Sequence, residues 1–536
     1  MAQARKFNKM MLLFPPGKVY VYPDGSPGAR KHCSIPIGIA YLAANLRKYG
    51  YEACILDILV EGYSHEVYKE PFIVYGLPTE DVIARIRIEK PDIIGFSLMF
   101  SMLAEEAYAI CAAIKEAFPD LPIVMGGQHA SGAPFDVMKR ESINYILHGE
   151  ADNTIVHLMD ALNGLRPMDS VRGLYYRHPN GRIADTMSVA KAAVEGKGWN
   201  YYDRRESPVP SDLDGLPYPA FDLMNMNAYW GAAVRTGGGD AIGERFGVML
   251  ASRGCPHVCT FCTSPLQSGY RFYRKREIKS VLDEIRWQVE TFGVSEIQFV
   301  EDNFFVSKKY VKDLMRALAK EFPDIVFWNT SGVDVNALDK EMIDLMVDAN
   351  FHRALLAIEA GDPKVQAERV DKKVKLERLP DLVEYMKDRG IDLKALYMIG
   401  FPGETRAQIQ RTVDFALNLG ILDFNLSIVS PLPGTPLYDE CLEKGLFIEG
   451  TTLSNICFGK SVIKLPDTTP EELEDIRRLV WRQAFEKRIV IEEQERARLK
   501  AGIDTDVMHR YRSVGEYETL GFKTKPPPRG NSYAIN

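Results

Sequence analysis

Two successive series of alternating apolar strands and amphipathic helices predict an α/β protein. The first series favours a doubly wound, Rossmann-like domain, because strands and helices alternate at the spacing of a parallel sheet. The second series contains six strand–helix units and favours a partial (β/α)6 TIM-type barrel. A helical C-terminal region is predicted to follow. With 536 residues, the chain is long enough for two or three domains.

The first domain is predicted at 1–165. An amphipathic helix is expected around Ile39–Leu46, with Gly50 as its C-terminal stop, and another at 103–118. Short apolar runs predict five strands, at 10–14, 53–57, 92–97, 123–125 and 145–147. Parallel sheets bind ligands in the loops at their carboxyl edge, so this edge is the expected binding face.

Residues 166–240 are Pro-containing and less regular, and we interpret them as a connector with a hairpin turn at Arg177–Gly181. The barrel is predicted at 241–455 and the helical region at 456–536. Thr469-Pro-Glu-Glu472 is a capping box that would start a helix running to about Lys500. The six barrel strands are predicted at 246–251, 296–301, 326–330, 354–359, 393–399 and 424–429.

Composition excludes several classes of protein. A formal net charge of −7 gives no overall basic field for nucleic acid. No apolar run is long enough to span a bilayer, and the N-terminus lacks a signal-peptide pattern, so we expect a cytoplasmic protein without an integral membrane segment. Eight cysteines in so long a chain are too few for a disulfide scaffold.

Three of the cysteines crowd into eight residues, Cys255, Cys259 and Cys262, with the spacing C-x3-C-x2-C. This loop follows the first strand of the second series. Three thiolates on a short loop can ligate three corners of a [4Fe–4S] cluster and leave the fourth iron open to an exogenous molecule. Structural zinc is the alternative, but it requires a fourth ligand, and His257 would be cramped inside the loop.

Ser252-Arg-Gly-Cys-Pro-His-Val-Cys-Thr-Phe-Cys262 resembles the signature of the radical S-adenosylmethionine (SAM) superfamily. Later segments resemble that family in the same order, at 297–303, 355–361, 397–404 and 431–436. The resemblance implies that SAM chelates the open iron and yields a 5′-deoxyadenosyl radical. It also implies that Glu301, Asp302 and Glu359 lie near SAM, although each could instead form a salt bridge inside the barrel. Ala360 stands where many relatives have Ser, which removes a hydroxyl contact.

The first domain resembles the cobalamin-binding domains fused to many such enzymes, through 35–39, 95–97, 126–131 and 148–152. Glycines directly after strands let the backbone approach a flat ligand. The Asp-x-His-x-x-Gly motif that supplies a cobalt-ligating histidine in some cobalamin proteins is absent, so we expect His129 to pack near the corrin rather than bind cobalt. The resemblance implies cobalamin contacts from Ser97, Leu98, Gly126, Gly127, Gln128, His129, Gly149 and Glu150.

Together these features resemble the class B, cobalamin-dependent radical SAM methyltransferases. The implied activity is methyl transfer from methylcobalamin to an unactivated carbon, or to phosphorus, of a small-molecule or biosynthetic-intermediate substrate. The alternatives are a cobalamin-dependent radical cyclase or rearrangement enzyme without methyl transfer and, more remotely, a non-catalytic cobalamin sensor. The expected partners are the substrate and an electron donor such as flavodoxin or ferredoxin. The sequence identifies no catalytic acid or base.

Overall fold

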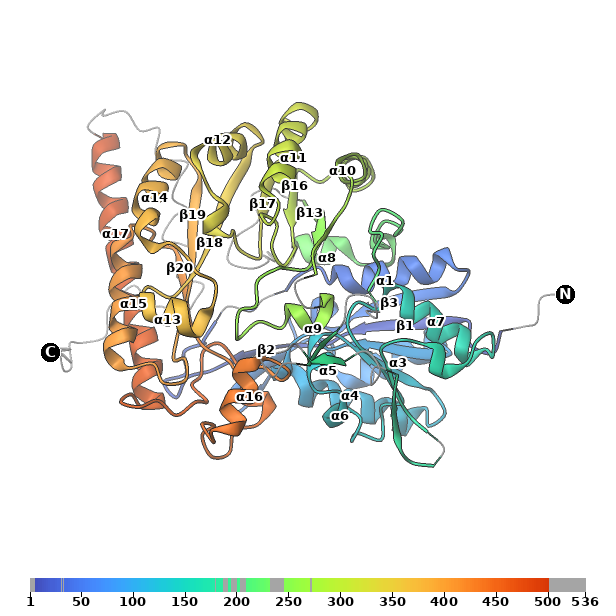
Figure 1. Ribbon diagram of the computed structural model, residues 1–536. Helices are drawn as coiled ribbons and strands as arrows, with labels where there is room; N and C mark the ends of the chain where they lie inside the picture. The colour runs from blue at the N-terminus through green and yellow to red at the C-terminus, as the bar shows by residue number, and fades with distance from the viewer. Residues whose placement is uncertain are drawn as a thin grey trace.

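The computed structural model describes residues 5–29, 31, 33–178, 180–186, 191–193, 200–202, 209–231, 245–269 and 272–500. Figure 1 shows two α/β units side by side, the first in blue to teal and the second in green to orange. Both predicted series of strands and helices are therefore present, each built around its own sheet.

The first unit is a seven-stranded sheet in the order β10-β9-β8-β7-β6-β1-β3. Five of these strands are parallel, and their order corresponds to the 2-1-3-4-5 order of flavodoxin-like doubly wound domains. The predicted parallel sheet is thus confirmed. The strands are β1 (Lys9–Phe14), β3 (Glu52–Asp57), β6 (Ile93–Ser97), β7 (Ile123–Gly126), β8 (Tyr145–Leu147), β9 (Leu174–Arg177) and β10 (Ile183–Asp185).

Helices cover both faces of this sheet, as the doubly wound arrangement requires. One apolar layer joins the sheet to α1 (Ile37–Lys48) and α7 (Asp152–Leu162). The other joins it to α3 (Thr79–Glu89) and α4 (Ala104–Ala117). Three short helices complete the unit, namely α2 (Ile58–Glu61), α5 (Gln128–Gly132) and α6 (Pro134–Val137).

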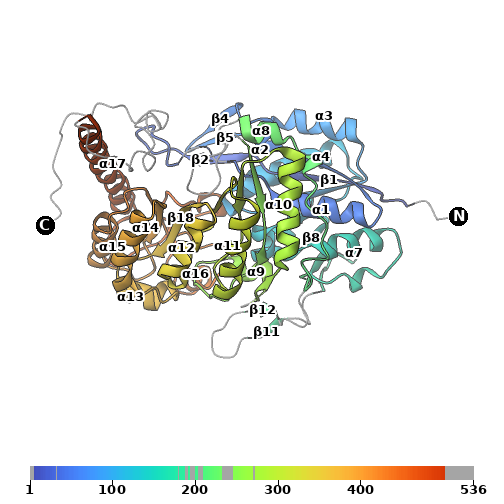
Figure 2. The ribbon, with the colours of Figure 1, turned by 90° about the horizontal axis from the view of Figure 1, so that it is seen from above.

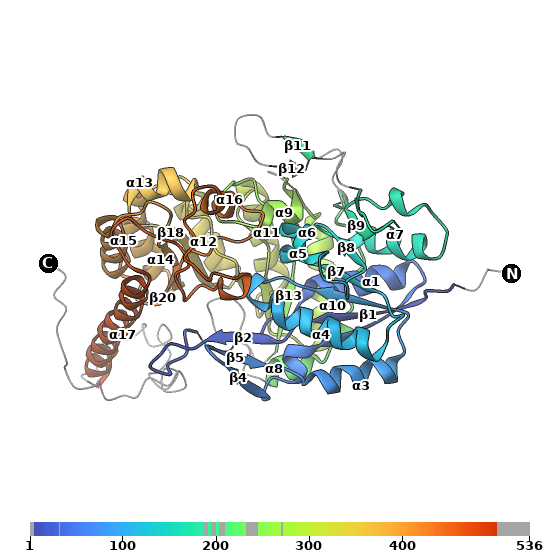
Figure 3. The ribbon, with the colours of Figure 1, turned by 90° about the horizontal axis from the view of Figure 1, so that it is seen from below.

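A separate three-stranded antiparallel sheet, β2-β5-β4, was not predicted from the sequence. Its strands are β2 (Gly17–Tyr20), β4 (Glu66–Lys69) and β5 (Phe72–Tyr75), and Figure 3 shows them together at one side of the first unit. Each strand has only four residues, and β4 is exposed along its whole length. Such short segments give no alternating pattern long enough to identify.

The segment predicted as a connector, 166–240, is partly integral to the first unit. The hairpin at Arg177–Gly181 is confirmed, because β9 pairs with β10. However, β9 also pairs antiparallel with β8 and so extends the first sheet beyond the predicted boundary at residue 165. Farther along, α8 (Met226–Gly231) places the Tyr229 hydroxyl 2.5 Å from Asp57 Oδ2. Two short strands, β11 (Lys191–Ala193) and β12 (Asn200–Tyr202), pair with each other.

The second unit is a six-stranded parallel sheet in sequential order, from β13 to β20, as predicted for a partial barrel. Figure 2 shows α10, α11, α12 and α14 over its strands. The strands are β13 (Phe246–Met249), β16 (Glu296–Phe299), β17 (Val326–Asn329), β18 (Phe351–Glu359), β19 (Asp392–Ile399) and β20 (Phe424–Ile428). The helices are α10 (Ile278–Phe292), α11 (Lys308–Glu321), α12 (Lys340–Asp348), α13 (Pro363–Val365), α14 (Leu379–Asp388), α15 (Arg406–Asn418) and α16 (Pro436–Glu443).

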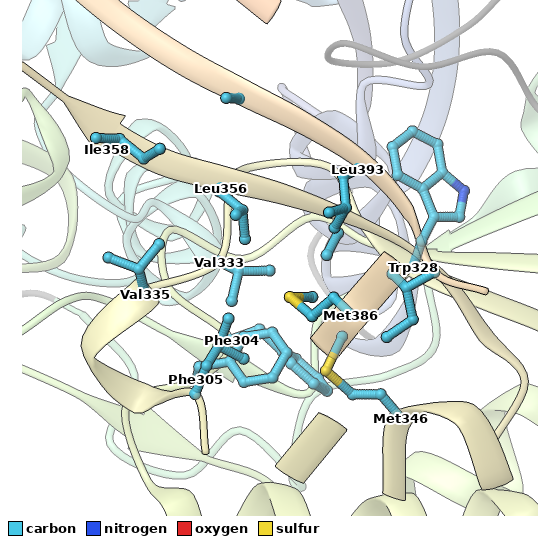
Figure 4. Packing of buried hydrophobic residues seen from close by; sticks show 14 of the residues in the cluster. Phe304, Phe305, Trp328, Val333, Val335, Met346, Leu356, Ile358, Met386 and Leu393 are labelled. Carbon is cyan, nitrogen blue, oxygen red and sulfur yellow. The ribbon is translucent and has the colours of Figure 1, made fainter. Parts of the chain in front are cut away.

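The core of the second unit lies between these strands and their helices. Figure 4 shows part of it, where Phe304 and Phe305 lie near Val333 and Val335. Phe304 and Phe305 pack edge to face, with ring centroids 5.2 Å apart. This packing fixes the chain directly after Asn303, and therefore helps to position the carboxyl end of β16 at the site described below.

The long helix α17 (Pro470–Lys500) follows the barrel, and its predicted capping box is present. The Thr469 backbone N–H donates to Glu472, and the Glu472 N–H donates to Thr469 Oγ1. Arg477 of this helix reaches the first unit, where it donates to the Gly28 carbonyl at 3.1 Å. Residues 501–536 of the predicted helical region lie outside the described residues. No helix in the described part of the chain is long and apolar enough to cross a membrane.

Candidate cluster and cofactor site

The three clustered cysteines lie on a loop between β14 (Ser252–Arg253) and α9 (Ser264–Ser268). Gly254 allows the chain to enter this loop, because it has a φ of +84° and a Cβ there would lie 1.9 Å from the Phe272 carbonyl oxygen. Pairing of β14 with β15 (Arg274–Lys275) closes the loop at its base. All three thiols are free of disulfides and partly buried.

The surroundings of the thiols fit an iron–sulfur cluster. Asn303 Nδ2 lies 3.7 Å from Cys255 Sγ, and the Ser264 backbone N–H points to Cys262 Sγ at 3.5 Å. Such N–H donors stabilise cluster thiolates. Without a cluster, burial raises the pKa of all three thiols, that of Cys262 to about 12. Bound iron would supply the positive charge that keeps them deprotonated.

The alternative of a structural zinc ion finds less support in the geometry. Among the residues that the structure describes, no three Cys, His, Asp or Glu side chains are close enough to hold a single metal ion. Each cysteine of a [4Fe–4S] cluster binds a different iron, so the thiols need not converge on one point. His257, the zinc ligand considered within the loop, has its Nε2 bonded to Asp334 Oδ2 at 2.8 Å.

Two of the predicted carboxylates, Glu301 and Asp302, follow β16 and lie beside the cysteine loop. Glu301 is fully buried, and its Oε1 accepts a hydrogen bond from the Ala251 N–H at 2.5 Å. Its Oε2 has no hydrogen-bond partner among the described residues, and burial raises the pKa of Glu301 to about 8. Asp302 is exposed, and its negative charge raises the pKa of the buried Cys255 and Cys262 thiols further.

The third predicted carboxylate, Glu359, ends β18 and pairs with Lys372 at 3.2 Å, as the salt-bridge alternative anticipated. Lys372 also donates to the Ala357 carbonyl at 2.9 Å, and its positive charge lowers the pKa of the nearby Cys259 thiol against the effect of burial. Glu359, Asp371 and Lys373 all have positive φ values, of 72°, 56° and 57°. Strained non-glycine residues cluster at functional sites, and these three are one member of the ion pair and the two chain neighbours of the other.

Lys372 and Asp334 were not predicted as site residues from the sequence. Burial would raise the pKa of Asp334, but the hydrogen bond with His257 and the charge of Lys372 hold it below its ordinary value. Lys372 follows Glu359 by 13 positions and lies after a π-helical turn at Gln366–Val370. No periodic pattern in the sequence marks either residue, because both reach the site from loops.

In the first unit, the predicted cobalamin residues lie at the carboxyl ends of β6, β7 and β8. Gly127 has a φ of +97°, and a Cβ there would lie 2.5 Å from the Leu98 carbonyl oxygen, so only glycine fits. Gly126 accepts a hydrogen bond from the Leu98 N–H. Ser97 is half-buried, whereas the Leu98 side chain is fully buried in the core under α4.

His129 is buried, with both ring nitrogens engaged. Nε2 lies 2.9 Å from the Tyr108 hydroxyl, and Nδ1 lies 2.9 Å from Ser101 Oγ. Burial lowers the pKa of His129 to about 4, so the ring is neutral. This environment agrees with a packing role and leaves no ring nitrogen open to a metal.

The remaining predicted residues, Gln128, Gly149 and Glu150, contact the second unit. Gln128 Oε1 accepts a hydrogen bond from Thr263 Oγ1 at 2.7 Å. Gly149 has a φ of +74°, and a Cβ there would lie 3.0 Å from the Gln267 carbonyl oxygen. Glu150 is buried against Arg253, Arg274 and Ser268. The ligand edge of the first sheet therefore faces the cysteine loop.

These observations define a two-part cofactor protein, in which a cysteine loop at one end of a partial barrel meets the ligand edge of a flavodoxin-like domain. Comparison with known families agrees with both parts. The radical SAM superfamily matches residues 249–416, and the B12 binding domain family matches residues 28–159. The chain carries a radical SAM domain and a B12-binding domain, which imply a [4Fe–4S] cluster, SAM and cobalamin as cofactors.

Among curated proteins, the chain is 27% identical over 481 residues to cytidylyl-2-hydroxyethylphosphonate methyltransferase of Streptomyces wedmorensis, covering 87% of each chain. It is 24% identical over 466 residues to the anaerobic magnesium-protoporphyrin IX monomethyl ester cyclase of Cereibacter sphaeroides, covering 85% of this chain and 68% of that protein.

Among solved structures, the chain resembles the radical SAM methyltransferase TsrM from Kitasatospora setae with cobalamin and [4Fe–4S] cluster bound. The TM-score is 0.63 at 20% identity, covering 82% of this chain and 75% of that one. It also resembles the cobalamin-dependent SAM radical enzyme OxsB, with a TM-score of 0.62 at 15% identity, covering 96% and 70%. These likenesses support the fold.

Proposed function

We propose that the protein is a cobalamin-dependent radical SAM methyltransferase acting on a small-molecule substrate. One observation carries this proposal: the loop with Cys255, Cys259 and Cys262 contacts the cobalamin-binding edge of the first unit through Thr263 and Gln128. The proposed sites for a radical generator and a methyl carrier would therefore share one interface. A cobalamin sensor would need neither the cysteine loop nor the six-stranded barrel.

In this proposal, Cys255, Cys259 and Cys262 hold the cluster. Glu301, Asp302 and Glu359, together with Lys372, line the adjacent space that SAM would occupy. The ammonium of Lys372 is suited to the carboxylate of the methionyl group, since charge-assisted hydrogen bonds to carboxylates are strong. When bound, the cluster and SAM supply a 5′-deoxyadenosyl radical and cobalamin supplies the methyl group.

For cobalamin, we propose that backbone and shape matter more than side-chain ligation. Ser97, Gly126, Gly127 and Gly149 lie at strand ends, where the chain can approach a flat ring. His129 would hold the shape of this edge through Tyr108 and Ser101 without binding cobalt. Leu98, Gln128 and Glu150 would act through packing and contacts with the second unit.

Methyl transfer is favoured over cyclisation by the relatives. The match to the Streptomyces phosphonate methyltransferase covers 87% of that protein at 27% identity, whereas the match to the cyclase covers 68% of that protein at 24% identity. A cyclase-type reaction without methyl transfer is the second candidate, because the match to the cyclase also spans both units. The electron donor is proposed to be a flavodoxin- or ferredoxin-type protein, since the cluster must be reduced before SAM is cleaved.

Product stoichiometry tests the proposal. In a methyltransferase of this kind, methylating cobalamin would consume one SAM and release S-adenosylhomocysteine, whereas forming the substrate radical would consume another and yield 5′-deoxyadenosine and methionine. Each methylated product should therefore appear with about one equivalent of each by-product. Anaerobic turnover with methyl-labelled SAM, analysed by mass spectrometry, measures all three. Deoxyadenosine with an unmethylated product and no matching S-adenosylhomocysteine would favour the cyclase-type reaction.

A further inference from the structure

A buried ion cluster crosses between the two units next to the cysteine loop. Glu150 lies in the loop after β8 and Asp152 begins α7, whereas Arg253 and Arg274 come from the strands that close the cysteine loop. Arg253 donates to Asp152 Oδ2 at 2.8 Å and to Glu150 Oε2 at 3.0 Å. Arg274 donates to Glu150 Oε2 at 3.1 Å. The four side chains are 5% to 11% exposed.

The four side chains of this ion cluster keep one another charged. Burial would raise the pKa of Glu150, but the guanidinium groups of Arg253 and Arg274 hold it below its ordinary value. Arg253 also lies over the Tyr41 ring of α1, with its guanidinium carbon 4.9 Å from the ring centroid. Charges this deeply buried are tolerated when they are paired, so removing one member would leave its partner buried without a counter-charge.

A second set of contacts holds the other end of the cysteine loop. Thr263, which directly follows Cys262, donates to Gln128 Oε1 at 2.7 Å. Gln128 Nε2 donates in turn to Gln267 Oε1 at 3.2 Å. The Gln267 carbonyl accepts the Glu150 backbone N–H at 3.2 Å. Both flanks of the loop, at Arg253 and at Thr263, are therefore bound to two of the three loops of the first unit that carry the predicted cobalamin residues, those after β7 and β8.

We propose that this double contact couples the two cofactors, so that a bound [4Fe–4S] cluster tightens cobalamin binding and bound cobalamin stabilises the cluster. The inference rests on the proposed function for the identity of both cofactors. Its physical basis is that 128–132 and 148–152, which carry predicted cobalamin residues, hydrogen-bond to the segment 253–268, which carries the cysteines. The cofactor that binds first restrains these shared contacts, so the second binds to loops with less conformational freedom left to lose.

The test measures binding of aquacobalamin to the full chain, by equilibrium dialysis under anaerobic conditions, before and after reconstitution with iron and sulfide. In the unmodified protein, the cluster should lower the Kd for cobalamin by about fivefold or more, the lower end of ordinary coupling between sites. Asp152→Asn keeps the shape of the side chain but removes its charge, and should bring the two Kd values together. Equal Kd values in the unmodified protein would overturn the coupling.

Thr263→Val provides a second variant if Asp152→Asn does not fold, because it deletes only the hydroxyl that donates to Gln128. It should also reduce the ratio of the two Kd values. Retention of the full ratio in a folded variant of either kind would overturn the role assigned to these contacts.

A matched control lies inside the second unit, where Arg353 of β18 pairs with Asp392 of β19 at 2.6 Å with side chains 7% and 23% exposed. Asp392→Asn should lower thermal stability but leave the ratio of Kd values unchanged. If the control variant reduced the ratio of Kd values as much as Asp152→Asn does, general destabilisation would explain both results and the inference would be overturned. Failure to bind cobalamin at all would overturn the B12 assignment as well, whereas independent binding of both cofactors would overturn only the coupling.

Discussion

The two sides of the interface between the units differ in how their polar groups are occupied. On the barrel side, the three thiols are free of disulfides, and Glu301 Oε2 has no partner among the described residues. On the side of the B12-binding domain, the His129 ring is engaged by Tyr108 and Ser101. Glu150 is likewise occupied by arginines of the barrel unit.

This difference indicates two ways of holding a cofactor. In the proposed function, the three thiols of the barrel side would ligate the cluster, so cluster binding would depend on individual residues. The B12 side offers strand ends and glycines such as Gly127, so we propose that cobalamin binding depends there on backbone shape, while its polar side chains build the interface. Substitutions on the barrel side should therefore have larger and more specific effects than substitutions of His129.

The largest effect is expected at the cysteines. Replacing Cys255, Cys259 and Cys262 together by Ala should abolish the iron–sulfur absorbance and all formation of 5′-deoxyadenosine, because no ligand set would remain for the cluster. Absorbance spectra, iron content and product analysis after anaerobic reconstitution measure this. Replacing the buried Cys111 or Cys441 by Ala serves as the control and should leave cluster content intact. Deoxyadenosine formation by the triple variant would contradict the cluster assignment.

A second strong effect is expected at Lys372. Lys372→Met keeps the length of the side chain but removes the ammonium beside Glu359, and should weaken SAM binding by about tenfold, the size of one lost charged hydrogen bond. The neighbouring Lys373 is exposed and also has a positive φ, so Lys373→Met is a matched control. Equilibrium dialysis with labelled SAM on the reconstituted protein compares the two. Equal affinities would remove Lys372 from the SAM site.

The sequence predicted the local features of the site but not its long-range contacts. The six barrel strands and the cysteine loop could be located because apolar runs and ligand spacing are local features. Lys372 could not, because its place beside Glu359 depends on the path of a loop after β18. The ion pair of Arg253 with Glu150 joins residues 103 positions apart, and only the docking of the two units brings them together.

The connector shows the same limit at the level of domains. Its Pro-rich composition predicted a linker, but β9 pairs with β8 and extends the first sheet. Pairing at a sheet edge depends on tertiary contacts that composition does not record. The short β2-β5-β4 sheet was missed for the related reason that four-residue strands carry too little pattern.

A smaller effect concerns the buried carboxyl group of Glu404, in the loop after β19. Its Oε2 accepts from the Gly400 and Phe401 N–H groups, and burial raises its pKa to about 7. Between the unfolded pKa of 4.5 and about 7, the folded chain holds a proton that the unfolded chain has released. Glu404 therefore costs stability as pH rises through this window.

Glu404→Gln removes this titration, so the variant should gain about 1–3 kcal/mol relative to the unmodified protein between pH 5 and pH 8. Chemical denaturation at several pH values, followed by circular dichroism, measures the difference. Glu384→Gln, at an exposed position of α14, is the control and should follow the unmodified protein. A stability difference independent of pH would show that Glu404 is already ionised in the folded chain.

The smallest effect is expected at His129, because a B12 side that holds cobalamin without side-chain ligation predicts no change in the cobalt spectrum. Both ring nitrogens have protein partners and burial lowers the pKa of His129 to about 4, so the ring stays neutral and neither nitrogen is free to ligate cobalt. Electron paramagnetic resonance of the Co(II) state should lack nitrogen splitting from a protein imidazole. His129→Gln should leave the cobalt spectrum unchanged, as should His148→Gln, the matched change at the second buried histidine near this edge. A splitting that responds to ¹⁵N-labelled histidine and disappears in His129→Gln would make His129 the lower ligand, and the B12 side would then also hold its cofactor by side-chain ligation.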